Sequence, residues 1–293
     1  MKNFWIRTAS ATVYAALMIL VICFDMIFPQ FSDGLDNRSV FGFLIEYAFF
    51  LFVMVVGLFE FYRMAEAKGL RPMKALGYVA GLMFFGILLC VMLVQYEETF
   101  FAGLIVFLFL LPLLPIIAVL LALFRKEDNP FADLGVTILG VLYVALPLML
   151  FVLLSDNSIL GQGVMMMVVV LIWLNDAFAY MGGSLIGKHK LWPRHSPGKT
   201  WEGCAVGLLF SILAAIFVGP LLGGEFSWYV WMLIAVFCSV IGTLGDLAES
   251  MFKRSCGVKD SGTIMPGHGG ILDRFDSILA VTPFLLIIAF IAH

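Results

Sequence analysis

The chain has 293 residues, of which 62% are hydrophobic and only 13% are charged, and its net charge is -3. The mean hydropathy is +1.06, whereas a soluble domain is about half apolar and about a quarter charged, so this composition excludes a soluble protein. Long apolar runs recur along the whole chain, and the short alternating segments of a membrane β-barrel are absent, so we expect membrane-spanning helices. Nothing in the composition indicates a nucleic-acid partner.

Nine apolar segments predict about nine transmembrane helices in an all-α polytopic membrane protein. The first follows a charged N-terminus, as in a signal peptide, but its apolar run is long and no convincing small-residue cleavage site follows, so we expect a retained helix. No soluble domain fits between the segments. They cover residues 8–29, 41–62, 75–95, 100–124, 134–154, 163–186, 204–223, 228–250 and 271–292.

The distribution of Lys and Arg predicts which side of the membrane each loop faces, because cytoplasmic loops retain these residues. The chain has 17 Lys and Arg residues, and all except Arg38 fall in the N-terminus or in the second, fourth, sixth and eighth connections, the eighth counted together with the start of the last helix. This alternation supports the nine-span count, since one missed helix would disrupt it. We therefore expect a cytoplasmic N-terminus, a C-terminus on the opposite side, and cytoplasmic polar loops at residues 187–203 and 251–270.

Ionisable residues occur inside the early spans as well. Glu60 and Arg63 are spaced to form a structural i,i+3 pair on one helix. Asp25 and Glu46 lie near the expected outer interface, where carboxylates are tolerated, and the sequence assigns them no role.

The later spans concentrate polar residues at their cytoplasmic ends. Asn175 and Asp176 lie in the sixth segment. On the eighth, helical spacing places Asp246, Glu249 and Ser250 on one face, and the ninth begins with Asp273 and Asp276, again at i,i+3. Because the eighth helix ends at the depth where the ninth begins, the two acidic faces are expected to meet.

Carboxylates that converge in a low-dielectric site repel one another unless a cation lies between them. Oxygen ligands of this kind suit Mg²⁺, so we expect a magnesium site here. The alternative is neutralisation by Asp–Arg and Glu–Lys pairs, for which Lys253, Arg254 and Arg274 are available. The glycine-rich loop beside the cluster favours the metal.

That loop, SGTIMPGHGG, precedes the ninth helix. Glycines let backbone N–H groups approach an anion, and a helix N-terminus favours negative charge. Together with Lys259 and the neighbouring cations, these are the parts of a phosphoryl- or nucleotidyl-transfer site. His268, between two glycines, is interpreted as a substrate contact, with a structural role as the alternative.

The other polar loop contains GKT, which resembles the end of a P-loop. We reject that match, because Pro193 stands where the earlier glycine is required and no strand is expected before it. Lys199 and Thr200 remain candidates for phosphate binding.

Residues 250–276 resemble the signature of the phosphatidate cytidylyltransferase (CDP-diacylglycerol synthase) family. Met265 stands where Leu, Ile or Phe is usual. The segments NDAFAY, SPGKTWEG and GDLAES also look like family segments, so the resemblance covers about residues 170–277, and it is only one of general hydropathy before that. The matching residues are Ser250, Lys253 and Arg254, Lys259 and Asp260, Pro266, His268, Gly269 and Gly270, Asp273 and Arg274, and Asp276.

The resemblance implies an enzyme that joins CTP and phosphatidic acid to give CDP-diacylglycerol and pyrophosphate, with Mg²⁺ and with a second cation left open. It implies that Asp246 and Asp273 hold the metal. We expect catalytic roles for Lys253, Arg254, Lys259, Asp260, His268, Arg274 and Asp276, and substrate-binding roles for Asn175, Asp176, Ser196, Lys199, Thr200, Glu202, Glu249, Ser250, Gly267, Gly269 and Gly270.

Residues 1–160, with about five spans, are expected to form a scaffold, and residues 161–293, with about four spans and both polar loops, the catalytic region. We expect a bacterial plasma membrane protein whose site faces the cytoplasm and whose partners are CTP, phosphatidic acid and the lipid bilayer. The resemblance also suggests a homodimer. Two alternatives stay open. One is a CTP-dependent lipid kinase, and the other is a cation transporter that uses Asp176, Asp246 and Asp273.

Overall fold

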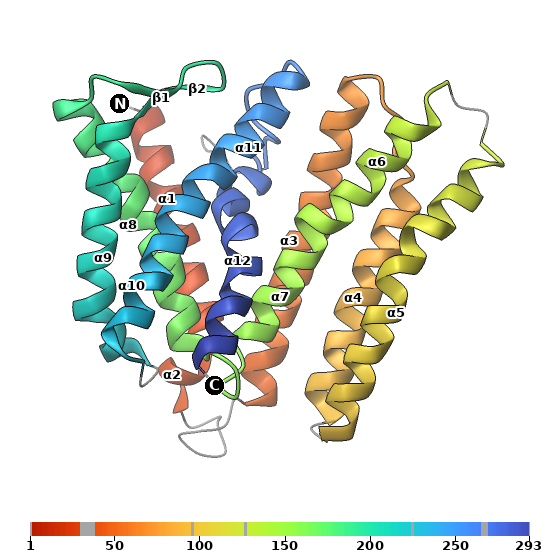
Figure 1. The fold of residues 1–293 in the computed structure, drawn as a ribbon, viewed down its shortest axis with the longest axis horizontal. Coiled ribbons are helices and arrows are strands. Elements are labelled where there is room, and N and C mark those ends of the chain that lie inside the picture. The colour runs from red at the N-terminus through yellow and green to blue at the C-terminus, as the bar shows by residue number, and fades with distance from the viewer. Residues whose placement is uncertain are drawn as a thin grey trace.

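The structure is a computed structural model that describes residues 2–29, 39–94, 97–125, 128–223, 226–264 and 269–292. The described chain is dominated by helices that run the length of one bundle (Figure 1). This confirms the predicted all-α polytopic class. The helices are α1 (Lys2–Ile22), α2 (Phe24–Ile27), α3 (Val40–Ala67), α4 (Lys74–Val94), α5 (Glu97–Ala122), α6 (Pro130–Gly140), α7 (Leu146–Leu154), α8 (Gln162–Ile186), α9 (Trp201–Leu222), α10 (Trp228–Val236), α11 (Gly242–Ser255) and α12 (Leu272–Ala292).

Each of the nine predicted segments coincides with helical structure. Eight spans in the described residues are long and apolar enough to cross a membrane, whereas the apolar helix Thr8–Ile22 at the start of the chain is shorter. Two of the eight are composite, because α6 and α7 form the single span Pro130–Leu154 and α10 and α11 form the span Trp228–Ser255.

Both composite spans contain a π-helical turn. Val141–Ala145 joins α6 to α7, and Phe237–Ile241 joins α10 to α11. Pro147 follows the first turn, and because it lacks an amide hydrogen it cannot complete the α-helical bond to the carbonyl four residues earlier. Such single π turns occur frequently at functional sites.

A short antiparallel hairpin connects α8 to α9, where the sequence predicted only a polar loop. Strand β1 (Lys190–Trp192) pairs with β2 (Ser196–Thr200), with Lys190 opposite Thr200 and Trp192 opposite Ser196. The hairpin lies at the end of the bundle where α1 begins, and α12 ends at the opposite end (Figure 1). Which end faces the cytoplasm stays a prediction.

Helices α8 and α9 pack closely beneath this hairpin because small residues line their contact. A Cβ atom on Gly207 would lie 2.7 Å from the backbone oxygen of Asn175, and one on Gly182 would lie 2.7 Å from Cβ of Val206. Small residues of this kind let membrane helices approach each other. Because the hairpin connects α8 to α9, this close packing also holds the two ends of the hairpin near each other in space.

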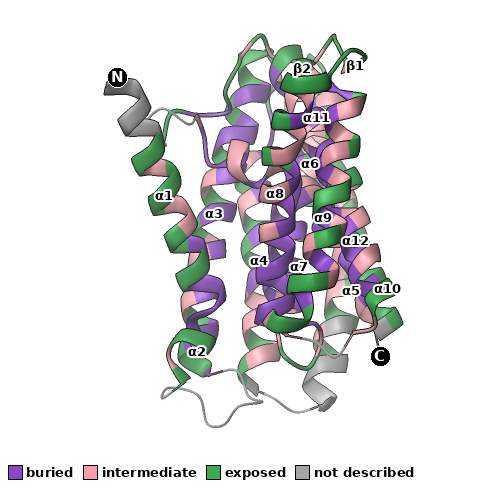
Figure 2. Cartoon of the chain, turned by 90° about the vertical axis from the view of Figure 1, so that its left-hand side faces the viewer, coloured by how far each residue is buried: buried purple, intermediate pink, exposed green. Residues whose placement is uncertain are grey.

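Large apolar side chains fill the centre of the bundle. Phe50 of α3 and Phe151 of α7 are fully buried, and the ring of Phe50 packs against those of Phe151 and of Phe275 in α12. Figure 2 shows buried residues through the middle of the bundle and exposed residues on the outer faces of α1 and α9. The exposed residues of the spans are themselves largely apolar, as lipid contact requires.

Candidate active site

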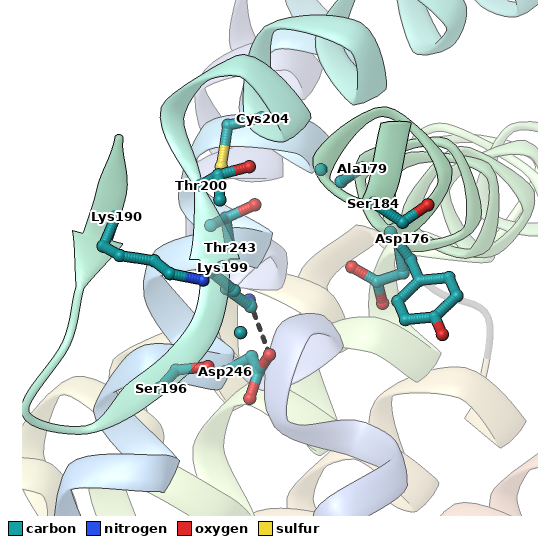
Figure 3. A pocket seen from close by; sticks show the side chains of 13 residues that line it. Asp176, Ala179, Ser184, Lys190, Ser196, Lys199, Thr200, Cys204, Thr243 and Asp246 are labelled. Atoms are coloured by element: carbon teal, nitrogen blue, oxygen red, sulfur yellow. Dashed lines mark ion pairs between the residues drawn. The ribbon is translucent and has the colours of Figure 1, made fainter. Parts of the chain in front are cut away.

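A cavity of about 560 Å³ opens at the hairpin end of the bundle. Its walls come from α8, the hairpin, the first turn of α9 and α11, as Figure 3 shows. This volume lies within the range of small-molecule sites, roughly 300–1,000 Å³. The lining residues are Asp176, Ala179, Tyr180, Gly183, Ser184, Lys190, Ser196, Gly198, Lys199, Thr200, Cys204, Thr243 and Asp246.

An ion pair crosses the cavity from the hairpin to α11. Nζ of Lys199 lies 2.5 Å from Oδ2 of Asp246, and both side chains are partly exposed, at 22% and 31% (Figure 3). Ser250, one turn after Asp246, donates a hydrogen bond to Oδ1 of this carboxylate at 3.3 Å. Asp176 of α8 faces the same space and is close enough for its charge to interact with Asp246 and Lys199. The cavity therefore contains carboxylates and a lysine that can exchange partners with a charged ligand.

The N-terminus of α9 also opens into the cavity. Thr200 is the N-cap residue, and its hydroxyl accepts a hydrogen bond from the backbone N–H of Gly203 at 3.1 Å. A helix N-terminus carries partial positive charge from its unpaired N–H groups. With Lys199 and Lys190 beside it, this part of the cavity wall suits a phosphate group.

Glu202, predicted to bind substrate, contacts the base of the hairpin. Its carboxylate accepts hydrogen bonds from the backbone N–H groups of Lys188 at 3.1 Å and His189 at 3.2 Å, and its Oε1 lies 2.6 Å from Nδ1 of His189. Glu202 is not among the cavity-lining residues. In this structure it fixes the start of the hairpin that carries Lys199.

A second charged cluster joins α11 to α12. Nζ of Lys253 lies 3.0 Å from Oε2 of Glu249 and 2.5 Å from Oδ1 of Asp273. The three side chains are almost buried, at 11%, 0% and 6% exposed. Asp276 is close enough for its charge to interact with Glu249 and with Asp246. The acidic faces of the two helices therefore meet, as predicted, and Lys253 lies between them.

Asp273 is also held by the loop before α12. Its Oδ2 accepts hydrogen bonds from the backbone N–H of Ser261 at 2.9 Å and of Gly270 at 2.7 Å, and it lies 3.0 Å from the hydroxyl oxygen of Ser261. Gly269 has a φ of +86°, and a Cβ there would lie 2.5 Å from the same oxygen. The glycines predicted to approach an anion thus approach the carboxylate of Asp273.

Asn175 is buried beneath the cavity. Its Oδ1 accepts a hydrogen bond from the hydroxyl of Ser239 at 2.6 Å, and its Nδ2 donates to the hydroxyl of Thr243 at 3.3 Å and to Asp176 at 3.5 Å. Ser239 belongs to the second π turn. Asn175 therefore joins α8 to this turn and orients Asp176.

The remaining predicted residues that the structure describes are not among those that line the cavity. Arg254, Lys259 and Asp260 are exposed, and Nη1 of Arg254 donates to the carbonyl of Val258 at 3.4 Å. Arg274 is partly buried, and its backbone carbonyl accepts a hydrogen bond from the hydroxyl of Tyr14 at 3.2 Å. The predicted residues Gly267 and His268 lie outside the described residues.

Eight of the thirteen cavity-lining residues were missed by the sequence interpretation, and Thr243 and Lys190 are the two most relevant to a charged ligand. Thr243 precedes Asp246 by three positions, so helical spacing could have placed both on one face. Lys190 lies opposite Thr200 across the hairpin, and without the hairpin its position could not be inferred.

The carboxylates of the two helices α11 and α12 are the candidate ligands of a magnesium ion. Within the described ranges, no three Asp, Glu, His or Cys side chains are arranged to hold a metal ion by themselves. Mg²⁺ is commonly bound by one or two carboxylates together with substrate phosphates and water, so a protein cage of three ligands is not required. Asp246 is open to the cavity, and its carboxylate oxygens are hard ligands that fit a divalent cation. Asp273, the second predicted ligand, is paired with Lys253 in this structure, so the ion would have to replace that ammonium group.

Comparison with known proteins shows the family of the chain. A model of the cytidylyltransferase family matches residues 37–292. The chain is 42% identical over 163 residues to a protein of Staphylococcus epidermidis named phosphatidate cytidylyltransferase. It is 43% identical over 165 residues to proteins of the same name from Staphylococcus haemolyticus and Staphylococcus aureus.

Each of these alignments covers 56% of this chain and 62% of the relative, which is less than two thirds of the relative's length. The family match is more extensive, since it takes in the segment from just before α3 to the end of α12 and therefore both charged clusters and the cavity. The chain belongs to the cytidylyltransferase family.

Proposed function

We propose that this protein transfers the cytidylyl group of CTP to phosphatidic acid, forming CDP-diacylglycerol and pyrophosphate in a Mg²⁺-dependent reaction. The observation that carries the proposal is the cavity at the hairpin end of the bundle, where Lys199 and the N-terminus of α9 face the carboxylates of Asp246 and Asp176. Family membership and the names of the relatives support the substrate pair.

The reaction needs no strong general base. A phosphate oxygen of phosphatidic acid is already anionic, and it attacks the α-phosphorus of CTP in line. The new P–O bond forms as the bond to the β-phosphate oxygen breaks, and the electron pair leaves on pyrophosphate. Catalysis then consists mainly of positioning and charge stabilisation. This suits a site with many fixed charges.

The charged side chains divide between two tasks. Lys199, Lys190 and the N–H groups at the start of α9 are positioned to bind phosphate oxygens. Asp246 and Asp273 would hold the magnesium ion, which neutralises phosphate charge when bound. Because Lys253 contacts Asp273 in this structure, that ammonium group would move toward phosphate as the ion is bound.

The α8 wall of the cavity suits a lipid substrate. Tyr180, one of its lining residues, is 79% exposed and lies near the end of a membrane-spanning helix. A phospholipid headgroup could therefore reach the cavity while its acyl chains stay between the helices. We further propose a bacterial plasma membrane location, a cavity that faces the cytoplasm, where CTP is present, and a homodimer.

The test uses purified protein in phosphatidic-acid-containing nanodiscs, with CTP and Mg²⁺. We expect pyrophosphate and CDP-diacylglycerol in equal amounts, and loss of both in Asp273→Asn and Asp246→Asn. The matched control is Glu66→Gln, because Glu66 pairs with Lys74 at the exposed end of α3. Release of CDP and a phosphorylated lipid alcohol would instead indicate a lipid kinase. Cation flux in proteoliposomes without nucleotide would indicate a transporter.

A further inference from the structure

Glu60 of α3 is a buried carboxylate whose hydrogen bonds reach the loop before α12 and the first residue of α12. It is 1% exposed. Its Oε2 accepts hydrogen bonds from the hydroxyl of Ser261 at 3.0 Å and the backbone N–H of Leu272 at 2.8 Å, and its Oε1 accepts one from the backbone N–H of Ile271 at 3.1 Å. The donors lie more than 200 positions away in the sequence.

The loop backbone is shaped to admit this carboxylate. A Cβ atom on Gly262 would overlap Oε1 of Glu60, and one on Gly270 would lie 2.6 Å from Oε1 and would overlap Oε2. Arg63, one turn later on α3, donates from Nη2 to the carbonyl of Ser261 at 3.0 Å. Helix α3 of the N-terminal half thus holds the loop through two side chains, the accepting carboxylate of Glu60 and the donating guanidinium of Arg63.

Ser261 connects Glu60 and Arg63 to Asp273. Its hydroxyl lies 3.0 Å from Oε2 of Glu60 and 3.0 Å from Oδ2 of Asp273, and its backbone N–H donates to Asp273. Asp273 in turn pairs with Lys253. A continuous series of contacts therefore runs from α3 through the loop to the charged cluster of α11 and α12.

We infer that Glu60 is a positioning residue for the proposed transfer reaction: it holds Ser261 and residues 270–272 in the one arrangement that fixes the carboxylate of Asp273. This inference rests on the proposed function. It gives the N-terminal half of the chain, expected to be a scaffold, a direct part in shaping the site.

The chemistry explains why a carboxylate serves here. Three donors converge on the two oxygens of Glu60, so both must accept. An amide has one accepting oxygen and one donating NH₂ group. In a Glu60→Gln variant the NH₂ group would therefore face a backbone N–H donor of the loop, and the hydrogen bond on that side would be lost. Shortening the side chain to aspartate would keep both acceptors and withdraw them by about one C–C bond, roughly 1.5 Å.

The experiment compares Glu60→Gln and Glu60→Asp with Glu66→Gln, an exposed glutamate on the same helix. Two readouts are taken on each variant in nanodiscs. The first is kcat for CDP-diacylglycerol formation at saturating substrates. The second is hydrogen exchange of the peptide spanning residues 259–275, measured without substrate or Mg²⁺.

We expect Glu60→Gln to lower kcat by about 10- to 100-fold, because displacing a reacting group by about 1 Å has effects of this size. The exchange of the 259–275 peptide should rise, while exchange in α8 and α9 stays as in the wild type. Glu66→Gln should change neither readout. Glu60→Asp, which keeps both acceptors, should retain more activity than Glu60→Gln.

A double-mutant test separates positioning from stability. Gly262→Ala should lower kcat because its methyl group displaces Glu60, whereas in a Glu60→Ala background the methyl group finds space and should add little. The control is Gly86→Ala in α4, where a Cβ meets no atom within 4 Å. Additive losses at Glu60 and Gly262 would overturn the inference.

Two further results would also overturn it. One is unchanged kcat and unchanged loop exchange in Glu60→Gln. The other is a rise in exchange throughout the protein with normal kcat per folded molecule, which would make Glu60 a stability residue. A wild-type protein that forms no CDP-diacylglycerol would refute the proposed function instead, and the exchange data would still report whether Glu60 orders the loop.

Discussion

Replacing Lys253 with methionine tests whether this lysine is the counter-ion of the buried cluster. The change keeps most of the aliphatic stem and removes the ammonium group that lies 3.0 Å from Glu249 and 2.5 Å from Asp273. It leaves two nearly buried carboxylates without their cation, and Asp276 close to them. We expect a large loss of stability.

The size of the loss follows from the burial of all three side chains. Removing one partner of a buried ion pair costs about 3–5 kcal/mol, because the remaining charge is left uncompensated. Lys253 also lies in the last turn of α11, where a cation interacts favourably with the helix dipole by about 0.3–1 kcal/mol. The ion pair and the interaction with the helix dipole both arise from the same ammonium charge, so their energies are not added. We therefore expect a loss of about 3–5 kcal/mol in the free energy of unfolding.

The assay is denaturant unfolding in mixed micelles, followed by the fluorescence of the six tryptophans. Lys68→Met, at the exposed C-cap of α3, serves as the control and should change stability by less than about 0.5 kcal/mol. The double variant Lys253→Met/Glu249→Gln removes one orphaned charge. It should recover part of the loss, with an interaction energy of about 0.5–3 kcal/mol.

A loss below about 1 kcal/mol, the size of an exposed pair, would refute the assignment of Lys253 as a buried counter-ion. Full additivity of Lys253→Met and Glu249→Gln would refute it as well. In the variant, the carboxylates of Glu249 and Asp273 lack the cation between them and repel each other. Added Mg²⁺ should therefore stabilise Lys253→Met more than the wild type.

Three further outcomes can be checked. Asp246→Asn should lower kcat by about 100-fold or more with little change in stability, since its side chain is partly exposed; thermal unfolding and product formation measured on one sample separate the two effects. Glu202→Gln should raise the KM for CTP and the hydrogen exchange of residues 188–200, because two backbone donors at the hairpin base lose a full carboxylate; unchanged exchange would contradict this. Gly207→Val should destabilise the protein by about 1–3 kcal/mol, because its side chain would meet Asn175, and denaturant unfolding measures the change.

The sequence predicted well what depends on hydropathy and helical spacing. All nine segments coincide with helices, since an apolar run of about 20 residues has few other structures available to it in a membrane. The same spacing correctly brought the acidic faces of α11 and α12 together, because residues three and four positions apart share a face. Helical spacing identified Glu249, Asp273 and Asp276 as members of these acidic faces.

The hairpin was not predictable by the same means. Its strands have three and five residues, and the longer one contains Ser196, Pro197 and Gly198, so they show no clear alternation and only one β-branched residue, Thr200. Pairing across a tight turn holds them together, and the carboxylate of Glu202 holds their base. The consequence for function is large, because the hairpin carries Lys199 into the cavity.

Contacts between distant parts of the chain were missed for a different reason. Glu60 and Arg63 are spaced as an i,i+3 pair, and the sequence interpretation treated them as partners. In the structure both reach Ser261, which lies about 200 positions later. Helical spacing shows which residues share a face and says nothing about what that face meets. Long-range pairing of this kind needs the fold.

Both carboxylates proposed to hold magnesium carry a lysine in this structure, Lys199 on Asp246 and Lys253 on Asp273, each at 2.5 Å. If the proposed function holds, this arrangement makes substrate binding an exchange of partners. Each lysine would pass from a carboxylate to a phosphate oxygen as the cation takes its place, so no charge becomes buried without a counter-charge. Uncompensated burial of one such charge costs several kcal/mol, and the exchange avoids it. Each lysine would then start beside the carboxylate that the cation takes over, so the charges of both sites would stay paired throughout substrate binding.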